Sequence, residues 1–363
     1  MSSVFGMIRA MSAVPRVHLA SPLDNAREIS HMLQAADEQH ADLCVFPELC
    51  LCGYSCGDLL LHPPLLDGCR QALEMLLAAP VHTAFIVGLP LEIGGRLYNC
   101  AVAVCGGRIL GVVPKEHLPN SGEFYERRWF EPGHSAPDTV VLCGQSVPVG
   151  QNLVFDCRRF SFGVEICEDL WVPAPPSASL CMGGALLIAN LSASNELVTK
   201  HRYRCELISQ QSARCLCGYV YAGAGYGEST TDLVFSGYAG VYENGRMLAE
   251  NERFKRENSF AVADLDVERL RFKRRQSRTF ADCAPESVHN VPFDLPEAHD
   301  ERLLRFVSPL PFVPAGAECD ARTEEILLIQ TTSLLTRMER VGTKRAVLGV
   351  SGGLDSTLTL LAA

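Results

Sequence analysis

The chain has 363 residues, more than one hydrophobic core usually supports, so we expect one large domain and part of a second. Its 32 basic and 42 acidic residues give a formal charge of -10, which argues against a nucleic-acid binder that works through a general positive field. No apolar stretch approaches the ~18 residues that span a bilayer, and the N-terminus lacks the apolar run of a secretory signal. We therefore expect no nucleic-acid partner and no membrane partner.

The chain contains 16 cysteines, which are scattered along its length. Cys100 and Cys105, for example, lie within predicted strands, and Cys157 directly follows one. This scatter favours buried, reduced thiols and a cytoplasmic protein over a disulfide framework. The densest group consists of Cys44, Cys50, Cys52 and Cys56, followed by His62. Its spacing matches no standard zinc finger or ribbon, so no metal site is predicted.

Strand-like and helix-like segments alternate from Arg16 to about Asp266, as in an α/β layered fold. Predicted strands cover residues 17–20, 43–48, 82–93, 97–105, 108–115, 152–156, 160–167, 185–192, 219–225, 232–243 and 259–266. Predicted helices cover residues 21–38, 68–78 and 199–217, and Ser21 with Asp24 has the pattern of a capping box. This density of strands predicts two packed sheets with helices on the outside.

The composition changes after residue 283. Prolines are spread through residues 284–322, at Pro285, Pro292, Pro296, Pro309, Pro311 and Pro314. Such spacing predicts an irregular connector that lies against a surface. A helical pattern resumes over residues 323–341, and a predicted strand at 346–350 leads into the last loop. The predicted domains are therefore 1–283, the connector 284–322, and 323–363.

Glu48, Lys115 and Cys167 each stand where a predicted apolar strand ends, which is where α/β folds place chemistry. Taken singly, they are explained as a solvated cap, a surface cation and core filling. Together they supply a base, a cation for an oxyanion and a nucleophile, and no Ser-His-Asp or Cys-His set is apparent. The acidic neighbours of the cysteine are Glu165, Glu168 and Asp169. Because they would raise the pKa of the thiol, an adjacent lysine is needed to hold a thiolate.

This order of Glu, Lys and Cys resembles the nitrilase superfamily, the carbon-nitrogen hydrolases. The motifs that carry the resemblance are Phe46-Pro47-Glu48, Lys115-Glu116-His117-Leu118-Pro119 and Cys167-Glu168-Asp169. The resemblance implies an α-β-β-α sandwich with Cys167 as nucleophile, Glu48 as base and Lys115 as cation. The family commonly needs a second glutamate that positions the substrate and the lysine. Glu123 is our choice for it, with Glu126 as the alternative.

The stretch SGGLDS at residues 351–356 follows a predicted strand and opens a predicted helix. It is not a Walker A loop, because no Gly-Lys-Ser/Thr follows. It resembles the pyrophosphate loop of the N-type ATP pyrophosphatases, in which backbone N–H groups and the helix N-terminus converge on phosphate. A plain Gly-Gly turn is the alternative. The expected ATP-binding residues are Ser351, Gly352, Gly353, Asp355 and Ser356.

An ammonia-releasing amidase joined to such a loop resembles the family of glutamine-dependent NAD synthetases. DLDVERLR at 264–271 resembles the end of that family's glutaminase domain, and RFVSPLPFVP at 305–314 resembles its connector. The resemblance implies L-glutamine as the ammonia source and no cofactor for its hydrolysis. It also implies ATP, Mg²⁺ and deamido-NAD for the full-length synthetase. We expect the chain to be a fragment of that synthetase and a homo-oligomer whose size the sequence does not set.

The resemblance also implies residues that contact glutamine. They are Tyr54, Ser121, Glu168, Ser194 and Lys200. Lys200 departs from the arginine often found at its position, and Ser121 stands where a tyrosine is common; either change could weaken glutamine binding. Two rival functions are a free-standing amidase for another small amide and a non-catalytic scaffold with the same fold. The SGGLDS stretch argues against the first, and retention of Glu48, Lys115 and Cys167 argues against the second.

Overall fold

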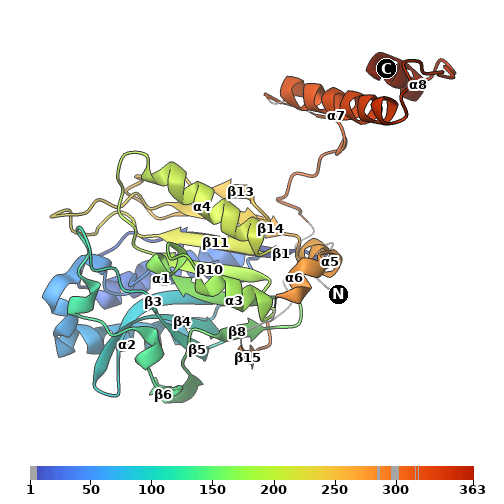
Figure 1. Ribbon diagram of the computed structural model, residues 1–363. Coiled ribbons are helices and arrows are strands. Elements are labelled where there is room, and N and C mark those ends of the chain that lie inside the picture. The colour runs from blue at the N-terminus through green and yellow to red at the C-terminus, as the bar shows by residue number, and fades with distance from the viewer. Residues whose placement is uncertain (1–5, 284–286, 296–301, 315, 318) are drawn as a thin grey trace. The chain divides into compact units, whose positions relative to one another are not determined.

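The computed structural model describes residues 6–283, 287–295, 302–314, 316–317 and 319–363. Contacts divide the chain into two units, Met1–Arg305 and Phe306–Ala363. The N-terminal unit consists of two large sheets packed together with helices on the outer faces (Figure 1). The expected α-β-β-α sandwich is therefore confirmed.

The first sheet has the strand order β14-β1-β2-β3-β4-β5, and the second has the order β13-β12-β11-β10-β9-β8-β15. The strands of the first sheet are β1 (Ile8–Val14), β2 (Leu43–Val45), β3 (Ala84–Ile93), β4 (Arg96–Cys105), β5 (Arg108–Pro114) and β14 (Ser259–Leu265). Those of the second are β8 (Leu153–Asp156), β9 (Ser161–Ile166), β10 (Leu187–Ser192), β11 (Gly218–Gly223), β12 (Ala239–Glu243), β13 (Arg246–Glu250) and β15 (His289–Pro292). A separate hairpin joins β6 (Thr139–Leu142) to β7 (Gln145–Pro148).

Helices cover the outer face of each sheet. The helices of this unit are α1 (Pro22–Glu38), α2 (Pro63–Leu77), α3 (Pro176–Met182), α4 (Lys200–Arg214), α5 (Val267–Gln276) and α6 (Arg278–Asp282). Side chains of α1 and α2 share an apolar cluster with the first sheet, and side chains of α3 and α4 share another with the second. Figure 1 shows α3 and α4 in front of the second sheet.

The innermost apolar layer lies between the two sheets. Along β1, Ala10 and Val14 belong to this layer, while Met11 and Ala13 belong to the layer under α1 and α2. This alternation is the period of two that a strand imposes on its side chains. Because both faces of the strand are covered, β1 is apolar on both sides, and every residue in it is buried.

The predicted strand at 17–20 is wrong. The first strand is β1, which pairs antiparallel with β14 and parallel with β2. Pro15 follows it and has no N–H to continue the ladder, so residues 17–20 form no strand. The predicted capping box is also absent, because the Ser21 hydroxyl donates to the Asp24 carboxylate at 2.7 Å and makes no bond to the backbone of the helix.

The predicted connector is not wholly irregular. Within it, β15 pairs in parallel with β8 and extends the second sheet. Further along, the Arg305 guanidinium donates to both carboxylate oxygens of Glu243, at 2.5 and 2.8 Å. The backbone N–H of Leu304 donates to Asp264 at 2.6 Å. These contacts tie residues 302–305 to the sandwich.

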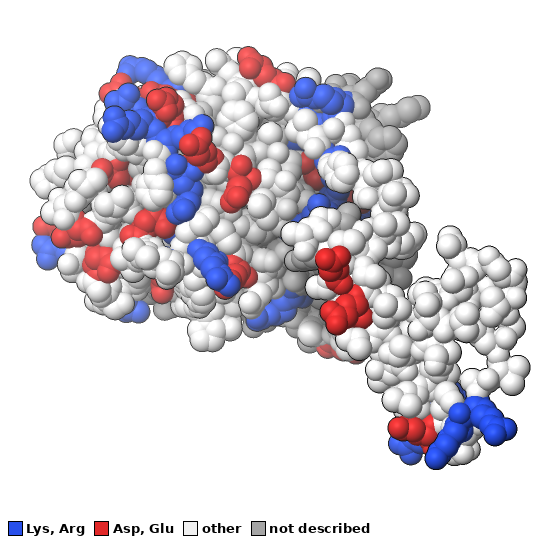
Figure 2. Space-filling view, turned by 90° about the horizontal axis from the view of Figure 1, so that it is seen from above, with Lys and Arg blue, Asp and Glu red and all other residues white. Residues whose placement is uncertain are grey.

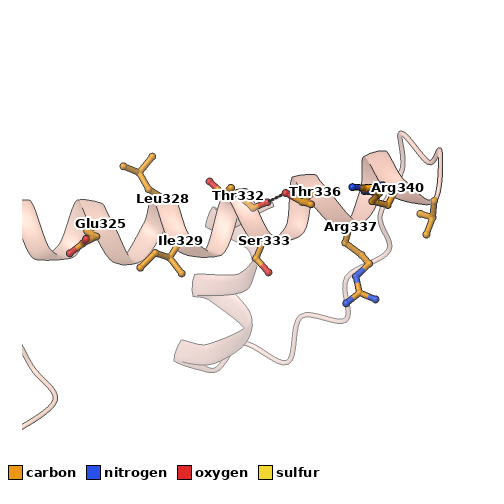
Figure 3. Close-up of a pocket in the computed structure, with 9 residues that line it drawn as sticks. Glu325, Leu328, Ile329, Thr332, Ser333, Thr336, Arg337 and Arg340 are labelled. Atoms are coloured by element: carbon orange, nitrogen blue, oxygen red, sulfur yellow. Dashed lines mark hydrogen bonds between the residues drawn. The ribbon is translucent and has the colours of Figure 1, made fainter. Parts of the chain in front are cut away.

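The C-terminal unit contains α7 (Cys319–Arg340) and α8 (Leu354–Ala362), and neither helix has a buried residue. Figure 3 shows one side of α7, where Leu328 and Ile329 border a hollow of about 880 Å³. The predicted helix at 323–341 is present, but the predicted strand at 346–350 is not formed. A strand needs a neighbour to satisfy its backbone N–H and C=O groups, and no described residue of this unit forms one.

Acidic and basic side chains are intermixed over the face shown in Figure 2. Neighbouring charges of opposite sign therefore offset one another on that face instead of adding to one strong field. Among the residues that the structure describes, no helix is long and apolar enough to cross a membrane. Within the same residues, no group of three or more His, Cys, Asp or Glu side chains is placed to hold a metal ion.

Candidate active site

Three strand ends meet inside the sandwich. Glu48 lies just beyond β2, Lys115 follows β5 directly, and Cys167 follows β9 directly. The first two strands belong to one sheet and the third to the other. Glu48 is 1% exposed, Lys115 0% and Cys167 5%, so the chemistry would take place away from bulk water.

Lys115 is held by two carboxylates. Its Nζ donates to Glu48 Oε1 at 2.7 Å and to Glu126 Oε1 at 2.6 Å. An ammonium group has three N–H donors, so these two bonds leave one N–H for a substrate. Burial alone would lower the pKa of Lys115, but Glu126 and Glu48 outweigh it and hold that pKa well above its ordinary value. Lys115 is therefore a permanent cation in this site.

Glu48 is fixed from three directions. Besides Lys115, its Oε1 accepts a hydrogen bond from Asn99 Nδ2 at 2.7 Å, and its Oε2 accepts one from the backbone N–H of Ala193 at 2.7 Å. The backbone carbonyl oxygen of Asn99 also accepts a hydrogen bond from the backbone N–H of Lys115, at 2.8 Å. One residue of β4 thus positions both the base and the cation.

Cys167 stands on a sharp turn. Its φ of 48° lies in the left-handed region that residues with a side chain rarely adopt, and a short 3₁₀ turn begins there. Asp169 braces this turn, since its Oδ2 accepts the backbone N–H of Ile166 at 3.1 Å. The Oδ1 of Asp169 accepts the backbone N–H of His117 at 2.9 Å. One carboxylate therefore ties the turn of Cys167 to the loop of Lys115.

Burial raises the pKa of the Cys167 thiol, the Glu48 carboxylate raises it further, and Lys115 opposes both. The thiol is therefore neutral at pH 7. The sequence predicts that Glu165, Glu168 and Asp169 raise this pKa, whereas the larger charges acting on Cys167 are those of Glu48, Lys115 and Glu126. A neutral thiol becomes a nucleophile only when a neighbouring base accepts its proton.

Glu126, and not Glu123, is the second glutamate at the lysine. Glu126 is buried and bonded to Lys115, as described above, whereas Glu123 accepts a hydrogen bond from Asn195. The reason is local: a 3₁₀ turn at Glu126–Arg128 directs the Glu126 side chain inward. Burial raises the pKa of Glu126 to about 7, because Lys115 offsets only part of the cost of a charge beside Glu48.

The expected glutamine contacts lie at different depths. The Tyr54 hydroxyl donates to Glu126 Oε1 at 2.8 Å, and Ser194 is buried. Lys200 is half-buried at the start of α4, where its Nζ donates to Asn195 Oδ1 at 2.5 Å. Burial lowers the pKa of Lys200 and raises that of Glu168.

Ser121 is not part of this arrangement. It is exposed, and its backbone oxygen accepts the N–H of Phe124 in a turn. Beside that turn, a cavity of about 150 Å³ opens next to Tyr54 and Glu123. Its other walls include Ser55, Phe124, Trp129, Ser229 and Leu233.

The expected ATP loop lies in the C-terminal unit, where its residues are exposed or half-buried. Gly352 has a φ of 87°, so a side chain there would be strained. The hydroxyls of Ser351 and Ser356 are 3.3 Å apart, and α8 begins at Leu354. The loop therefore presents hydroxyls at a helix N-terminus, which is a suitable arrangement for a phosphate group.

Sequence reasoning missed Asn99, the backbone N–H of Ala193 and the bracing role of Asp169. A buried asparagine within an apolar strand is a signal that could have identified Asn99, since buried polar groups need partners. No residue-level signal identifies Ala193, because its contribution comes from the backbone.

Comparison with known proteins bears directly on this site. A family model described as carbon-nitrogen hydrolase matches residues 15–275, which include all three strand-end residues. The chain belongs to the carbon-nitrogen hydrolase family. The glutamine-dependent NAD(+) synthetase of Mycobacterium tuberculosis is 42% identical over 371 residues, covering 99% of this chain and 55% of the relative. That of Thermotoga maritima is 33% identical over 357 residues, covering 93% and 55%.

The chain spans about half the length of these curated relatives, and its homology to them confirms the resemblance seen in the sequence. A glutamine-dependent NAD+ synthetase from Acinetobacter baumannii, solved with adenosine diphosphate, superposes with a TM-score of 0.63 at 25% identity, covering 98% of this chain and 57% of that one. A Nesterenkonia amidase of the nitrilase superfamily gives a TM-score of 0.58 at 20% identity, covering 76% and 97%, and supports the fold alone.

Proposed function

We propose that the N-terminal unit hydrolyses the side-chain amide of L-glutamine and releases ammonia. The observation that carries this is the buried contact of Lys115 with Glu48 and Glu126 at the ends of strands of one sheet, together with Cys167, which directly follows β9 of the other sheet. Homology to enzymes named glutamine-dependent NAD(+) synthetases supports glutamine as the amide. The base, the nucleophile and the cation are side chains of this chain, so we propose no cofactor for the hydrolysis.

The first half of the reaction forms a thioester. Cys167 transfers its thiol proton to Glu48, and its sulfur attacks the amide carbon. Lys115 donates its remaining N–H to the oxyanion, a charge-stabilising contact that is strong in a buried site. When the intermediate collapses, the C–N bond breaks, Glu48 returns the proton to nitrogen, and ammonia leaves. The γ-glutamyl group stays on the sulfur.

The second half releases glutamate. Glu48 takes a proton from water while the water oxygen attacks the thioester carbon. The C–S bond then breaks, the sulfur regains the proton from Glu48, and glutamate leaves. Because Asn99, Ala193 and Lys115 hold the Glu48 carboxylate in place, the same oxygen atoms can serve as base in both halves.

For the complete protein we propose that this ammonia amidates deamido-NAD to NAD at the expense of ATP with Mg²⁺. ATP supplies the activation of a carboxylate, so that nitrogen can displace AMP. The residues that would hold its phosphates are Ser351, Gly352, Gly353, Asp355 and Ser356. The solved relative with bound adenosine diphosphate supports the nucleotide. We further propose a cytoplasmic homo-oligomer; the free cysteines, most of them buried, support a reducing compartment.

A substrate panel tests the proposed function against the rival amidase. Ammonia release by the 363-residue chain is measured with glutamine, asparagine, acetamide and propionamide. We expect kcat/KM for glutamine to exceed that for each other amide by at least about tenfold, since contacts to the amino-acid end add binding. A higher kcat/KM for a short amide than for glutamine would contradict glutamine as the substrate and favour the free-standing amidase.

Glu126→Gln is expected to lower kcat/KM for glutamine about tenfold, because Lys115 loses one of its two carboxylates and becomes less well placed. Glu123→Gln is the matched comparison, with a smaller expected loss, because Glu123 bonds Asn195 and not Lys115. Steady-state ammonia release measures both variants. A larger loss in Glu123→Gln than in Glu126→Gln would restore Glu123 as the positioning glutamate.

The pH profile of kcat/KM is expected to rise between pH 6 and 8 with an apparent pKa of about 7, because burial raises the pKa of Glu126 to that value. Above the inflection Glu126 is ionised and holds Lys115; below it the carboxyl is neutral and the contact weakens. The apparent pKa belongs to the cluster of Glu48, Lys115 and Glu126. Initial rates of the parent chain and of Glu126→Gln provide the test, and an inflection near 7 that persists in the variant contradicts the assignment.

A further inference from the structure

A glutamate outside the three strand ends is connected to them by hydrogen bonds. Glu228 lies between β11 and β12 and is 8% exposed. Its Oε1 accepts the backbone N–H of Tyr54 at 2.8 Å, and its Oε2 accepts the backbone N–H of Ser55 at 2.9 Å. The Ser55 hydroxyl also donates to Oε2, and it accepts the backbone N–H of Ser229 at 2.7 Å. One carboxylate thus fixes the backbone of two consecutive residues.

The other end of Tyr54 reaches the reacting groups. Its hydroxyl donates to Glu126 Oε1, the same oxygen that accepts Lys115. Glu126 Oε2 is buried and has no hydrogen-bond partner among the described residues. The orientation of the Glu126 carboxylate therefore depends on Tyr54 and Lys115 together. A shift of the Tyr54 backbone would therefore move the Glu126 carboxylate and, through it, Lys115.

Close packing around Gly53 and Gly227 restricts movement of the two segments that Glu228 joins. Gly53, which precedes Tyr54, has a φ of 91°, and a Cβ there would lie 2.8 Å from Leu19 Cδ1. Gly227, which precedes Glu228, has a φ of 111°, and its Cβ would lie 1.8 Å from the carbonyl oxygen of Val17. Both segments therefore pack against residues 17–19. The Glu228 carboxylate joins them through its hydrogen bonds to Tyr54 and Ser55.

We propose that Glu228 is a positioning residue of this site: it fixes the backbone at Tyr54, so that the Tyr54 hydroxyl orients Glu126 and, through it, Lys115. The inference rests on the proposed amide hydrolysis but concerns a residue that the reaction scheme does not use. Glu228 also connects segments that line the 150 Å³ cavity, because its carboxylate accepts the backbone N–H groups of Tyr54 and Ser55 and it directly precedes Ser229. Its loss should change both the turnover and the fit of the substrate.

A double-mutant cycle with Tyr54→Phe separates this role from simple support of the fold. Glu228→Gln keeps the size of the side chain but replaces one acceptor with an NH₂ group that opposes a backbone N–H. We expect each single variant to lower kcat/KM for glutamine about tenfold, and the double variant to lose no more than about twofold beyond the worse single one. Such non-additivity arises because both changes disable the same hydroxyl. Loss factors that multiply, or no loss in Glu228→Gln, would overturn the proposal.

The control is Glu243→Gln, a second buried glutamate, which bonds Arg305 and the backbone N–H of Asp266 elsewhere in the sandwich. It is expected to lower the melting temperature by a similar amount while changing kcat/KM less than twofold. If Glu243→Gln lowers kcat/KM as much as Glu228→Gln does, the loss in Glu228→Gln is explained by reduced stability, and the proposal is overturned. If Glu228→Gln does not fold, Ser55→Ala takes its place in the cycle, because it removes one donor and buries no new charge.

A substrate-independent readout keeps this test separate from the proposed function. The rate at which iodoacetamide alkylates Cys167 depends on Glu48 and Lys115 but not on glutamine. The same cycle measured on this rate should show the same non-additivity. If the parent chain is alkylated but does not hydrolyse glutamine, the substrate assignment fails and the Glu228 cycle is still decided by the alkylation rates.

Discussion

Replacing Cys167 with alanine is expected to lower glutamine hydrolysis at least ~10⁴-fold, because the change removes the sulfur atom that forms the proposed thioester. The fold should survive the change. Cys167 is a small side chain on a positive-φ turn, and Asp169 holds that turn through backbone N–H groups that the substitution leaves in place. Ammonia release and thermal unfolding should be measured on the same preparation. We expect the variant to lose activity and to keep the melting temperature of the parent.

Covalent trapping gives the same prediction a second readout. An electrophilic glutamine analogue should add once to the parent chain, at Cys167, as measured by intact mass and peptide mapping. The matched control is Cys283→Ser, because Cys283 is an exposed thiol far along the chain from the site. That variant should be labelled as the parent is. An adduct that persists in Cys167→Ala would remove Cys167 from the role of nucleophile.

The strand-end residues were predictable because each ends an apolar run. The runs before Glu48 and Lys115 are apolar and buried, so the first charged side chain after each of them marks the edge of the sheet, whereas the run before Cys167 already contains the buried Glu165. The choice between Glu123 and Glu126 was not predictable in this way. Both lie in an irregular segment, and the inward direction of Glu126 depends on a single 3₁₀ turn. Spacing along the chain does not determine such a turn.

Two of the strands that sequence reasoning missed, β1 and β15, depend on distant partners. β1 exists because β14 and β2 flank it, and β15 exists because it pairs with β8 far earlier in the chain. Local apolar content favours a strand but does not supply the neighbour that satisfies its backbone. The segment at 346–350 illustrates the reverse case, because its composition favours a strand and the described residues of its unit offer no partner. The role of Glu228 also depends on distant partners, since Tyr54 and Ser55 come from a loop far earlier in the chain.

Lys115→Met is expected to lower kcat/KM for glutamine about a hundredfold, close to 3 kcal/mol of transition-state stabilisation, as for the loss of one oxyanion donor. The structure adds a second consequence. Lys115 is wholly buried between Glu48 and Glu126, and removing one partner of a buried ion pair typically costs about 3 to 5 kcal/mol of stability. Part of that cost will be relieved by protonation of Glu126, whose pKa burial has already raised to about 7. The destabilisation should therefore be smaller at pH 6 than at pH 8.

A double variant separates the two consequences. In Lys115→Met with Glu126→Gln, one of the two unpaired buried charges is gone, so the melting temperature should recover toward that of the parent, while kcat/KM stays as low as in Lys115→Met. Recovery of stability without recovery of rate would assign the rate loss to the missing cation and not to a loosened site. Unchanged turnover in Lys115→Met would instead remove Lys115 from the mechanism, and the oxyanion would then have to be stabilised by backbone N–H groups. The thermal unfolding and the initial rates should be measured at both pH values, because a stability loss that is the same at pH 6 and pH 8 would contradict the protonation of Glu126.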